Sequence, residues 1–77
     1  MKIYIQVRLF ATLSRYMPEN PDHFPIESGA SVLDLLRHLG VPIESATLIF
    51  INGQRADVTS ILKEGERVGI FPPVGGG

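Results

Sequence analysis

Apolar and polar residues alternate strictly at the start of the chain. The alternation separates two sets of side chains: Ile3, Ile5, Val7 and Leu9 on one side, and Lys2, Tyr4, Gln6 and Arg8 on the other. Successive side chains of a strand point to opposite faces, so this pattern predicts a half-buried strand over residues 2–9. The segment that follows, residues 10–18, is rich in turn-forming residues and has room for one helical turn.

The clearest helix is predicted over residues 31–40. Its apolar residues recur at the spacing that forms one stripe along a helix: Val32, Leu35, Leu36 and Leu39. Ser31 is a favourable N-cap, and Asp34 stands three residues further on, as in a capping box. Gly40 is expected to end the helix, because glycine accepts the left-handed backbone found there and Pro42 prevents continuation.

Short strands with turns between them make up the rest of the pattern. They are predicted at residues 23–27, 47–51, 54–56 and 67–71. Pro25 confines the first of these to a sheet edge, because proline has no N–H to donate to a ladder. Asn52-Gly53 predicts a tight hairpin between the second and the third. Another turn, at residues 63–66, precedes the last.

One amphipathic helix among several strands predicts an α+β fold, because the helix must bury its stripe on a sheet face. The element order resembles the β-grasp fold of ubiquitin, a mixed sheet of four to five strands packed on one main helix. In that fold the first and last strands lie side by side at the centre of the sheet. We therefore expect a β-grasp domain over residues 1–71, with these inward side chains: Ile3, Ile5, Val7, Leu9, Ile49, Ile51, Val68 and Ile70.

The same alternation predicts an apolar patch on the opposite sheet face. The residues expected to point away from the helix are Phe10, Leu48, Phe50 and Phe71, together with Tyr4. Phe50 and Phe71 should lie close together, because the third and last strands are neighbours in the β-grasp order. Such a patch on a small domain usually marks a partner surface. The alternatives are a loop that covers it or a strand register shifted by one residue.

Composition excludes several classes of function. The chain has 77 residues, 44% of them hydrophobic and 19% charged, as in a single globular domain. Its net charge of −1 gives no electrostatic case for nucleic-acid binding. No apolar run reaches membrane-spanning length and no signal peptide is apparent, so we expect a cytoplasmic protein. The absence of cysteine excludes a thiolate metal site or a cysteine nucleophile.

Other chemistry-bearing side chains have surface roles in this interpretation. His38 falls on the solvated face of the predicted helix, where pairing with Asp34 at i,i+4 is expected. His23 lies in a polar loop or edge strand, and Glu64 and Glu66 flank a turn. We expect no metal site, no permanently bound cofactor and no catalytic constellation.

The last segment of the sequence is unusual: Phe71-Pro72-Pro73-Val74-Gly75-Gly76-Gly77. The prolines stiffen the backbone, and the glycines then remove every side chain. Residues 72–77 would form a flexible tail, and from Phe71 a fully extended segment would reach roughly 20 Å. Such a tail can carry a terminal carboxylate into a narrow cavity of a partner. The alternatives are a disordered end or a cloning remnant.

The chain resembles the MoaD/ThiS group of ubiquitin-like sulfur carriers, and in particular the small subunit of molybdopterin synthase. The matching segments cover its whole length: Arg8-Leu9-Phe10-Ala11, the helix 31–39, Ile51-Asn52-Gly53, Leu62 to Val68, and the ending Phe-Pro-Pro-Val, one variable residue, Gly-Gly. Arg55 stands where a relative can carry an apolar residue, so the partner contact can differ in detail.

The resemblance implies chemistry at the C-terminal diglycine. An ATP-dependent, ubiquitin-activating-type enzyme would adenylate the Gly77 carboxylate, and sulfur from a donor would replace AMP to give a thiocarboxylate. The tail (Pro72, Pro73, Val74, Gly75 and Gly76) would enter the large subunit of molybdopterin synthase and deliver sulfur to a pterin precursor of the molybdenum or tungsten cofactor. The chain would then be a carrier that is not catalytic alone, acting as the small subunit of a sulfurtransferase.

Four other functions stay open on the sequence. The same sulfur chemistry serves thiamine thiazole formation and tRNA thiolation. A ubiquitin-like modifier would instead join its terminus to lysines of other proteins. A plain β-grasp interaction module would have an inert terminus.

Overall fold

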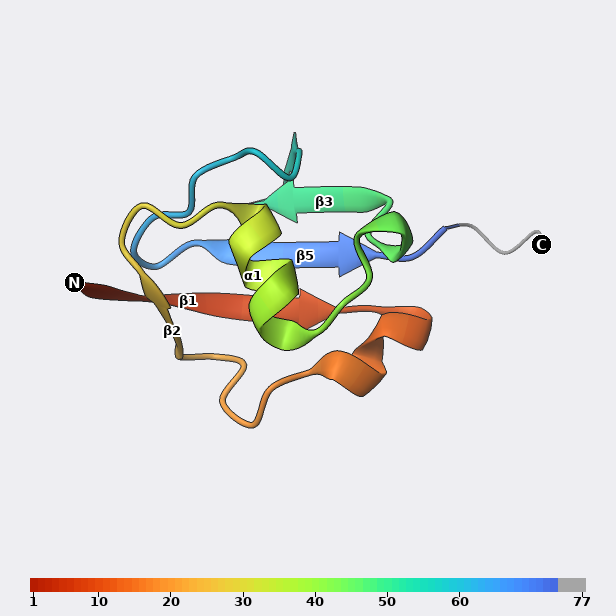
Figure 1. Ribbon diagram of the computed structural model, residues 1–77, viewed down its shortest axis with the longest axis horizontal. Coiled ribbons are helices and arrows are strands. Elements are labelled where there is room, and N and C mark those ends of the chain that lie inside the picture. The colour runs from red at the N-terminus through yellow and green to blue at the C-terminus, as the bar shows by residue number, and fades with distance from the viewer. Residues whose placement is uncertain (74–77) are drawn as a thin grey trace.

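The computed structural model describes residues 1–73 and has a mixed sheet packed on one main helix (Figure 1). Its strands are β1 (Lys2–Leu9), β2 (Phe24–Glu27), β3 (Leu48–Ile51), β4 (Gln54–Ala56) and β5 (Arg67–Phe71). Its helices are α1 (Val32–Leu39) and two short 3₁₀ helices, η1 (Ala11–Tyr16) and η2 (Ile43–Ser45). The α+β, β-grasp fold predicted from the sequence is confirmed.

The five strands form one sheet in the order β2-β1-β5-β3-β4. β1 and β5 run parallel to each other at its centre, while every other neighbouring pair is antiparallel. Figure 1 shows these two strands side by side, with α1 lying across them. β2 is an edge strand, as Pro25 requires, because a proline in the interior of a sheet would leave a ladder hydrogen bond unmade.

Helix α1 begins and ends where the sequence predicts. The Ser31 hydroxyl accepts a hydrogen bond from the Asp34 amide at 3.2 Å, and an Asp34 carboxylate oxygen accepts one from the Ser31 amide at 3.0 Å. This reciprocal capping box satisfies two N–H groups at the start of the helix. Gly40 follows the last turn with φ of 81°, a left-handed conformation that glycine adopts without steric cost.

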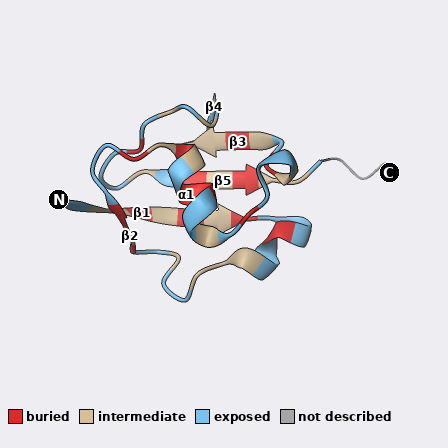
Figure 2. Cartoon of the chain, viewed as in Figure 1, coloured by how far each residue is buried: buried red, intermediate tan, exposed pale blue. Residues whose placement is uncertain are grey.

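The core lies between α1 and the inner face of the sheet (Figure 2). Its most completely buried side chains come from the strands and the helix stripe: Val7, Val32, Leu35, Leu36, Val68 and Ile70, all fully inaccessible to solvent. Ile49 of β3 is 3% exposed, whereas Ile51 is only half-buried and packs against the rim of the core. The inward set predicted by alternation is therefore correct, with Ile51 less deeply placed than expected.

The described part of the chain ends just beyond the sheet. The carbonyl of Phe71 accepts a hydrogen bond from the Thr47 amide at 3.0 Å. Pro72 is half-buried and Pro73 is exposed. The predictions for Val74, Gly75, Gly76 and Gly77 lie outside the described residues. Helix α1, with eight residues, is the longest helix of residues 1–73, and none there has the length and apolar character needed to cross a membrane.

Candidate functional site

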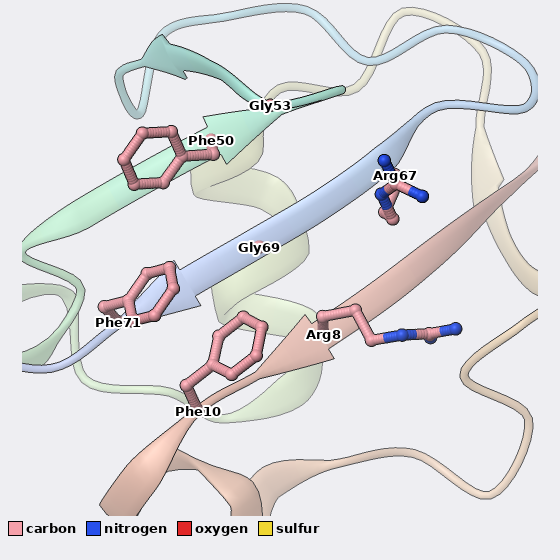
Figure 3. A pocket seen from close by; sticks show the side chains of 7 residues that line it. All are labelled: Arg8, Phe10, Phe50, Gly53, Arg67, Gly69 and Phe71. Carbon is pink, nitrogen blue, oxygen red and sulfur yellow. The ribbon is translucent and has the colours of Figure 1, made fainter.

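Three phenylalanine rings gather on the sheet face turned away from α1 (Figure 3). Phe10 follows β1, Phe50 lies in β3, and Phe71 ends β5. The rings of Phe10 and Phe71 are stacked, with centroids 4.3 Å apart and planes 8° from parallel. Phe50 meets Phe71 edge-on at 5.8 Å and 85°. Both arrangements are favoured between aromatic rings. We call these three residues the aromatic cluster.

Strand register brings the aromatic cluster together. β3 pairs with β5 so that Leu48 is opposite Phe71 and Phe50 is opposite Gly69. Alternation then places all of these outward, because Ile49 and Ile70 between them point into the core. Phe10 is 40% exposed, and Leu48, Phe50 and Phe71 are half-buried. The four residues predicted as an outer patch thus share one face, and their role in partner binding stays a prediction.

Gly69 leaves a hollow beside the aromatic cluster. It lies between Arg8 of β1 and Phe50 of β3 in the same row across the sheet, with no side chain to fill the outer face. A methyl group at this position would lie 3.4 Å from the Phe10 ring. The hollow measures about 250 Å³ and has these lining residues: Arg8, Phe10, Phe50, Gly53, Arg67, Gly69 and Phe71 (Figure 3). It is an apolar depression in an otherwise regular sheet surface.

Two arginines line this hollow, and a third lies beside the aromatic cluster. Arg8 lies opposite Gly69 and forms an ion pair with Asp22, while its guanidinium also donates to the Val7 carbonyl at 2.9 Å. Arg55 of β4 lies opposite Phe50, so it borders the aromatic cluster on the other side. Arg67 lies two positions before Gly69 in β5, at the end of the hollow remote from Phe71.

The hollow is suited to binding rather than to proton transfer. Among residues 1–73, the only ionisable side chains that line it are Arg8 and Arg67, and a guanidinium stays protonated in proteins. No three His, Asp or Glu side chains within that range gather closely enough to hold a metal ion. The described face can therefore offer apolar contact and positive charge to a ligand.

The carboxylates with perturbed pKa values lie away from the hollow and stabilise local structure. Hydrogen bonds from the Ser31 amide and hydroxyl lower the pKa of Asp34. Hydrogen bonds from the Thr59 hydroxyl and then its amide lower the pKa of Asp57. A hydrogen bond from Lys2, followed by the contact with the N-terminal amine, lowers the pKa of Glu27. In each case the residues that lower the pKa belong to the same turn or strand pair as the carboxylate.

Tyr4 lies on the predicted outer face but does not join the aromatic cluster. It pairs with Pro25 of the edge strand, four residues before Arg8 along β1. Its ring stacks on His23, with centroids 3.9 Å apart and planes 2° from parallel. Alternation gave the correct face for Tyr4, but the sheet extends far enough along β1 to separate the two aromatic groups.

The expected pairing of His38 with Asp34 is wrong. The Asp34 carboxylate accepts from the Ser31 amide in the capping box. The His38 ring instead lies edge-on against Phe24 of β2, with centroids 5.5 Å apart. Each of the two residues therefore contacts a different neighbour: Asp34 contacts the N-cap residue, and His38 contacts an aromatic ring of β2.

The sequence interpretation placed Arg55 at the partner contact but missed the contributions of Gly69, Arg8 and Arg67 to the site. Gly69 interrupts the run Arg67-Val68-Gly69-Ile70-Phe71, and a glycine inside a strand often marks a place where another group approaches closely. Alternation also placed Arg8 on the outer face from the start. The glycine inside the strand and the outward position of Arg8 could both be seen in the sequence. Neither is an apolar residue with a side chain, so an interpretation based on hydrophobic pattern gave them no role.

A sheet of this order on one helix, with the outer face carrying an aromatic cluster, defines a ubiquitin-like protein. The chain belongs to the Mut7-C ubiquitin family, whose model matches residues 2–75. No curated protein matches the chain significantly.

Solved structures share the fold of this chain. The HVO 2177 protein of Haloferax volcanii is 25% identical with a TM-score of 0.77, and the alignment covers 99% of this chain and 88% of that one. SAMP1 from the same organism is 22% identical, with a TM-score of 0.66 and full coverage of both chains, and supports the fold alone.

A third structure carries the resemblance seen in the sequence. A proposed molybdopterin converting factor subunit 1 from Pyrococcus furiosus is 28% identical, with a TM-score of 0.64 and coverage of 94% of this chain and 99% of that one. The resemblance to the MoaD/ThiS group is thereby confirmed, and the chain has the ubiquitin-like fold that sulfur carriers and modifiers share.

Proposed function

We propose that this protein is a sulfur carrier whose reactive group is the carboxylate of Gly77. A ubiquitin-activating-type enzyme would use ATP to adenylate that carboxylate, with release of pyrophosphate. A sulfur nucleophile supplied by a donor would then attack the acyl carbon and expel AMP, which leaves a thiocarboxylate. Adenylation is needed because a carboxylate is a poor electrophile, whereas a mixed anhydride with AMP is a good one.

One observation carries the proposal: the aromatic cluster and the segment that leads to Gly77 meet at one residue. Phe71 is both the last residue of β5 and the central ring of the cluster, and Pro72 follows it directly. A partner that docks on the cluster would therefore hold the start of residues 72–77. From Phe71, an extended segment reaches roughly 20 Å, enough to enter an active site behind the docking surface.

The composition of residues 72–77 also supports the proposal. Glycine at the last position leaves the acyl carbon open to attack from either side. Pro72 and Pro73 reduce the number of conformations that must be lost when the segment enters a channel. The carrier itself then needs no acid, base or metal, since the partner enzymes supply the chemistry.

The acceptor that we propose is a pterin precursor in molybdenum or tungsten cofactor biosynthesis. Support comes from the Pyrococcus furiosus relative described as a proposed molybdopterin converting factor subunit 1. The chain would act as the small subunit of a molybdopterin synthase, and residues 72–77 would enter the large subunit. The aromatic cluster with Leu48 would be the docking surface for the activating enzyme and for this large subunit.

Intact-mass spectrometry tests the carrier chemistry directly. The native protein is first weighed to establish that its chain ends at Gly77. Incubation with the cognate activating enzyme, ATP and a sulfur donor should then exchange one terminal oxygen for sulfur. A chain with a tryptophan appended after Gly77 is the matched control and should gain no sulfur while its thermal melt is unchanged. Absence of both AMP transfer and sulfur gain in the native protein would contradict the proposal.

The product of the reaction separates the alternatives. A carrier regenerates its free carboxylate after it is mixed with the large subunit and the pterin precursor, and a sulfur-containing pterin appears. A protein modifier would instead form conjugates that resist reducing agents on a denaturing gel, because an isopeptide is not a thioester. Abundant conjugates that depend on Gly77, with no detectable thiocarboxylate, would replace the carrier by the modifier.

A further inference from the structure

The outward strand residues around the aromatic cluster include arginines and no carboxylate. Strand register places its outward residues in three rows: Phe10, Phe71 and Leu48 in the first, Arg8, Gly69, Phe50 and Arg55 in the second, and Gln6 and Arg67 in the third. None of these residues is acidic, although the chain as a whole has a net charge of −1. The nearby carboxylate of Asp22, from the loop before β2, is already paired with Arg8.

Two of the three arginines are available to a ligand. Arg8 forms an ion pair with Asp22. Among residues 1–73, the guanidinium groups of Arg55 and Arg67 make no hydrogen bond or ion pair, and both residues are exposed. Arg67 is fixed only through its backbone, since its amide donates to the Asn52 side chain at 2.9 Å. A planar guanidinium can pair with a carboxylate through two parallel hydrogen bonds.

The hollow over Gly69 is the right size for a side chain. Its volume of about 250 Å³ is below the range of roughly 300–1,000 Å³ that is usual for small-molecule sites. The rings of Phe10, Phe50 and Phe71 line it, together with Arg8, Gly53, Arg67 and Gly69. An apolar side chain placed there would contact the rings that line the hollow.

A protein segment suits this surface better than a nucleic acid does. The Phe10 and Phe71 rings are stacked on each other at 4.3 Å, so no base can insert between them. The net charge of −1 opposes the approach of a polyanion, whereas a short acidic segment meets the local charge of Arg55 and Arg67.

We propose that the hollow over Gly69 receives one large apolar side chain of a partner protein, and that Arg55 and Arg67 pair with carboxylates on either side of it. The inference rests on the docking role assigned to the aromatic cluster under the proposed function, and it is independent of the chemistry at Gly77. It names the partner's recognition segment: an apolar anchor flanked by acidic residues. Gly69 then determines specificity, because any side chain there would occupy the anchor's place.

A displayed library of random short peptides, panned against the full chain, tests the occupant. The enriched sequences should share one large apolar residue with Asp or Glu on both sides. A synthetic peptide of the enriched sequence is then titrated by calorimetry. Gly69→Val should weaken its binding at least about tenfold, because the anchor is displaced. The pair Arg55→Glu with Arg67→Glu should also weaken it at least about tenfold and reverse its salt dependence, because like charges then face each other.

Matched variants keep the result interpretable. Arg37→Glu reverses one charge, half the change made by the pair, on the exposed face of α1 away from the sheet, and should alter affinity by less than about twofold. Thermal melts establish that each variant is folded, and Gly69→Ala replaces Gly69→Val if the valine variant is not. No enrichment, enrichment of basic or neutral sequences, or equal binding by the glycine variant would overturn the inference. Tighter binding of an oligouridylate than of the selected peptide would overturn it in favour of single-stranded nucleic acid.

The sulfur-transfer assay separates this inference from the proposed function. Suppose that the panning selects no peptide, and that the wild-type chain and the Gly69 and arginine variants gain sulfur at the same rate. The docking inference then fails and the carrier proposal stands. If no chain gains sulfur but the peptide binds as described, the carrier proposal fails and the acidic-anchor site stands.

Discussion

The rings of Phe10 and Phe71 stack with centroids 4.3 Å apart, although Phe10 follows the first strand in the sequence and Phe71 ends the last. This contact connects the end of β1 to the end of β5, where the chain passes into Pro72. Stacked aromatic pairs contribute about 1 kcal/mol beyond the burial of their area. Phe10→Ala, Phe71→Ala and the double variant should therefore show a coupling free energy of about 1 kcal/mol in urea unfolding. Strictly additive effects would show that the two rings do not stack in solution.

Phe50→Asp should separate docking from folding. Phe50 is a half-buried outer residue of the aromatic cluster, so its loss should weaken binding to the activating enzyme at least about thirtyfold, the effect of about 2 kcal/mol. Its cost to folding should be moderate, since it removes the edge-on contact with Phe71 and exposes no core. Partner titration and a thermal melt of the same variant measure the two effects.

Ile49→Asp is the core control for that variant. Ile49 adjoins Phe50 in β3 but points inward and is 3% exposed, so a carboxylate there would be buried without a partner. That penalty is comparable with the whole free energy of unfolding of a small domain, about 5 kcal/mol, and the variant should be unfolded. The half-buried Ile51 would be a weaker control. A folded Ile49→Asp beside an unfolded Phe50→Asp would contradict the register of β3.

Two glycines should respond differently to the same substitution. Gly40→Ala forces a Cβ into the left-handed conformation after α1 and should cost about 1 kcal/mol. Gly69 lies in β5 and does not have a left-handed conformation, and a methyl group there would contact the Phe10 ring at an ordinary distance of 3.4 Å. Gly69→Ala should therefore change the free energy of unfolding by less than about 0.5 kcal/mol. Urea midpoints of the two variants give the comparison.

The capping box predicts one component of the pH dependence of stability. Hydrogen bonds from Ser31 hold the pKa of Asp34 below its ordinary value. A lowered folded pKa gives stability that is complete above the unfolded pKa and is lost as the pH falls through the folded pKa. The melting temperature of the wild type should exceed that of Asp34→Asn near neutral pH, and the difference should shrink below about pH 4.

A matched charge change tests that assignment. Glu44→Gln removes an exposed carboxylate of η2 that makes no hydrogen bond within residues 1–73, and it should not reproduce the pH-dependent difference. A constant gap between wild type and Asp34→Asn at every pH would show that ionisation of Asp34 does not contribute. Ser31→Ala, which removes the hydroxyl of the same capping box, should cost about 1 kcal/mol.

The fold could be predicted from the sequence because each local signal agreed with the global arrangement. Alternation in β1, the stripe and caps of α1, and the hairpin signal Asn52-Gly53 each specify one element, and Pro25 assigns β2 to an edge. A single amphipathic helix then leaves few ways to bury its stripe on a sheet. Agreement between local preference and tertiary packing is what makes such an inference work.

The site was only partly predictable, for a physical reason. Alternation reports which face a side chain takes, so Phe50 and Phe71 were correctly brought together. It does not report distance along the sheet, so it gave the face of Tyr4 but not its separation from the aromatic cluster. The hollow forms because Gly69 has no side chain, and a hydrophobic pattern does not predict such a hollow. The His38–Asp34 pairing failed because spacing on one helix contains no information on neighbours from β2.

The parallel pairing of β1 with β5 has a consequence for biosynthesis. The central ladder of the sheet joins the first strand of the domain to the last, so the ribosome must release β5 before the middle of the sheet can close. Contacts between such distant segments also slow folding, because a long loop must be closed before they form. A nascent chain truncated before Arg67 should therefore remain protease-sensitive, and folding should begin only when the segment that bears Phe71 emerges.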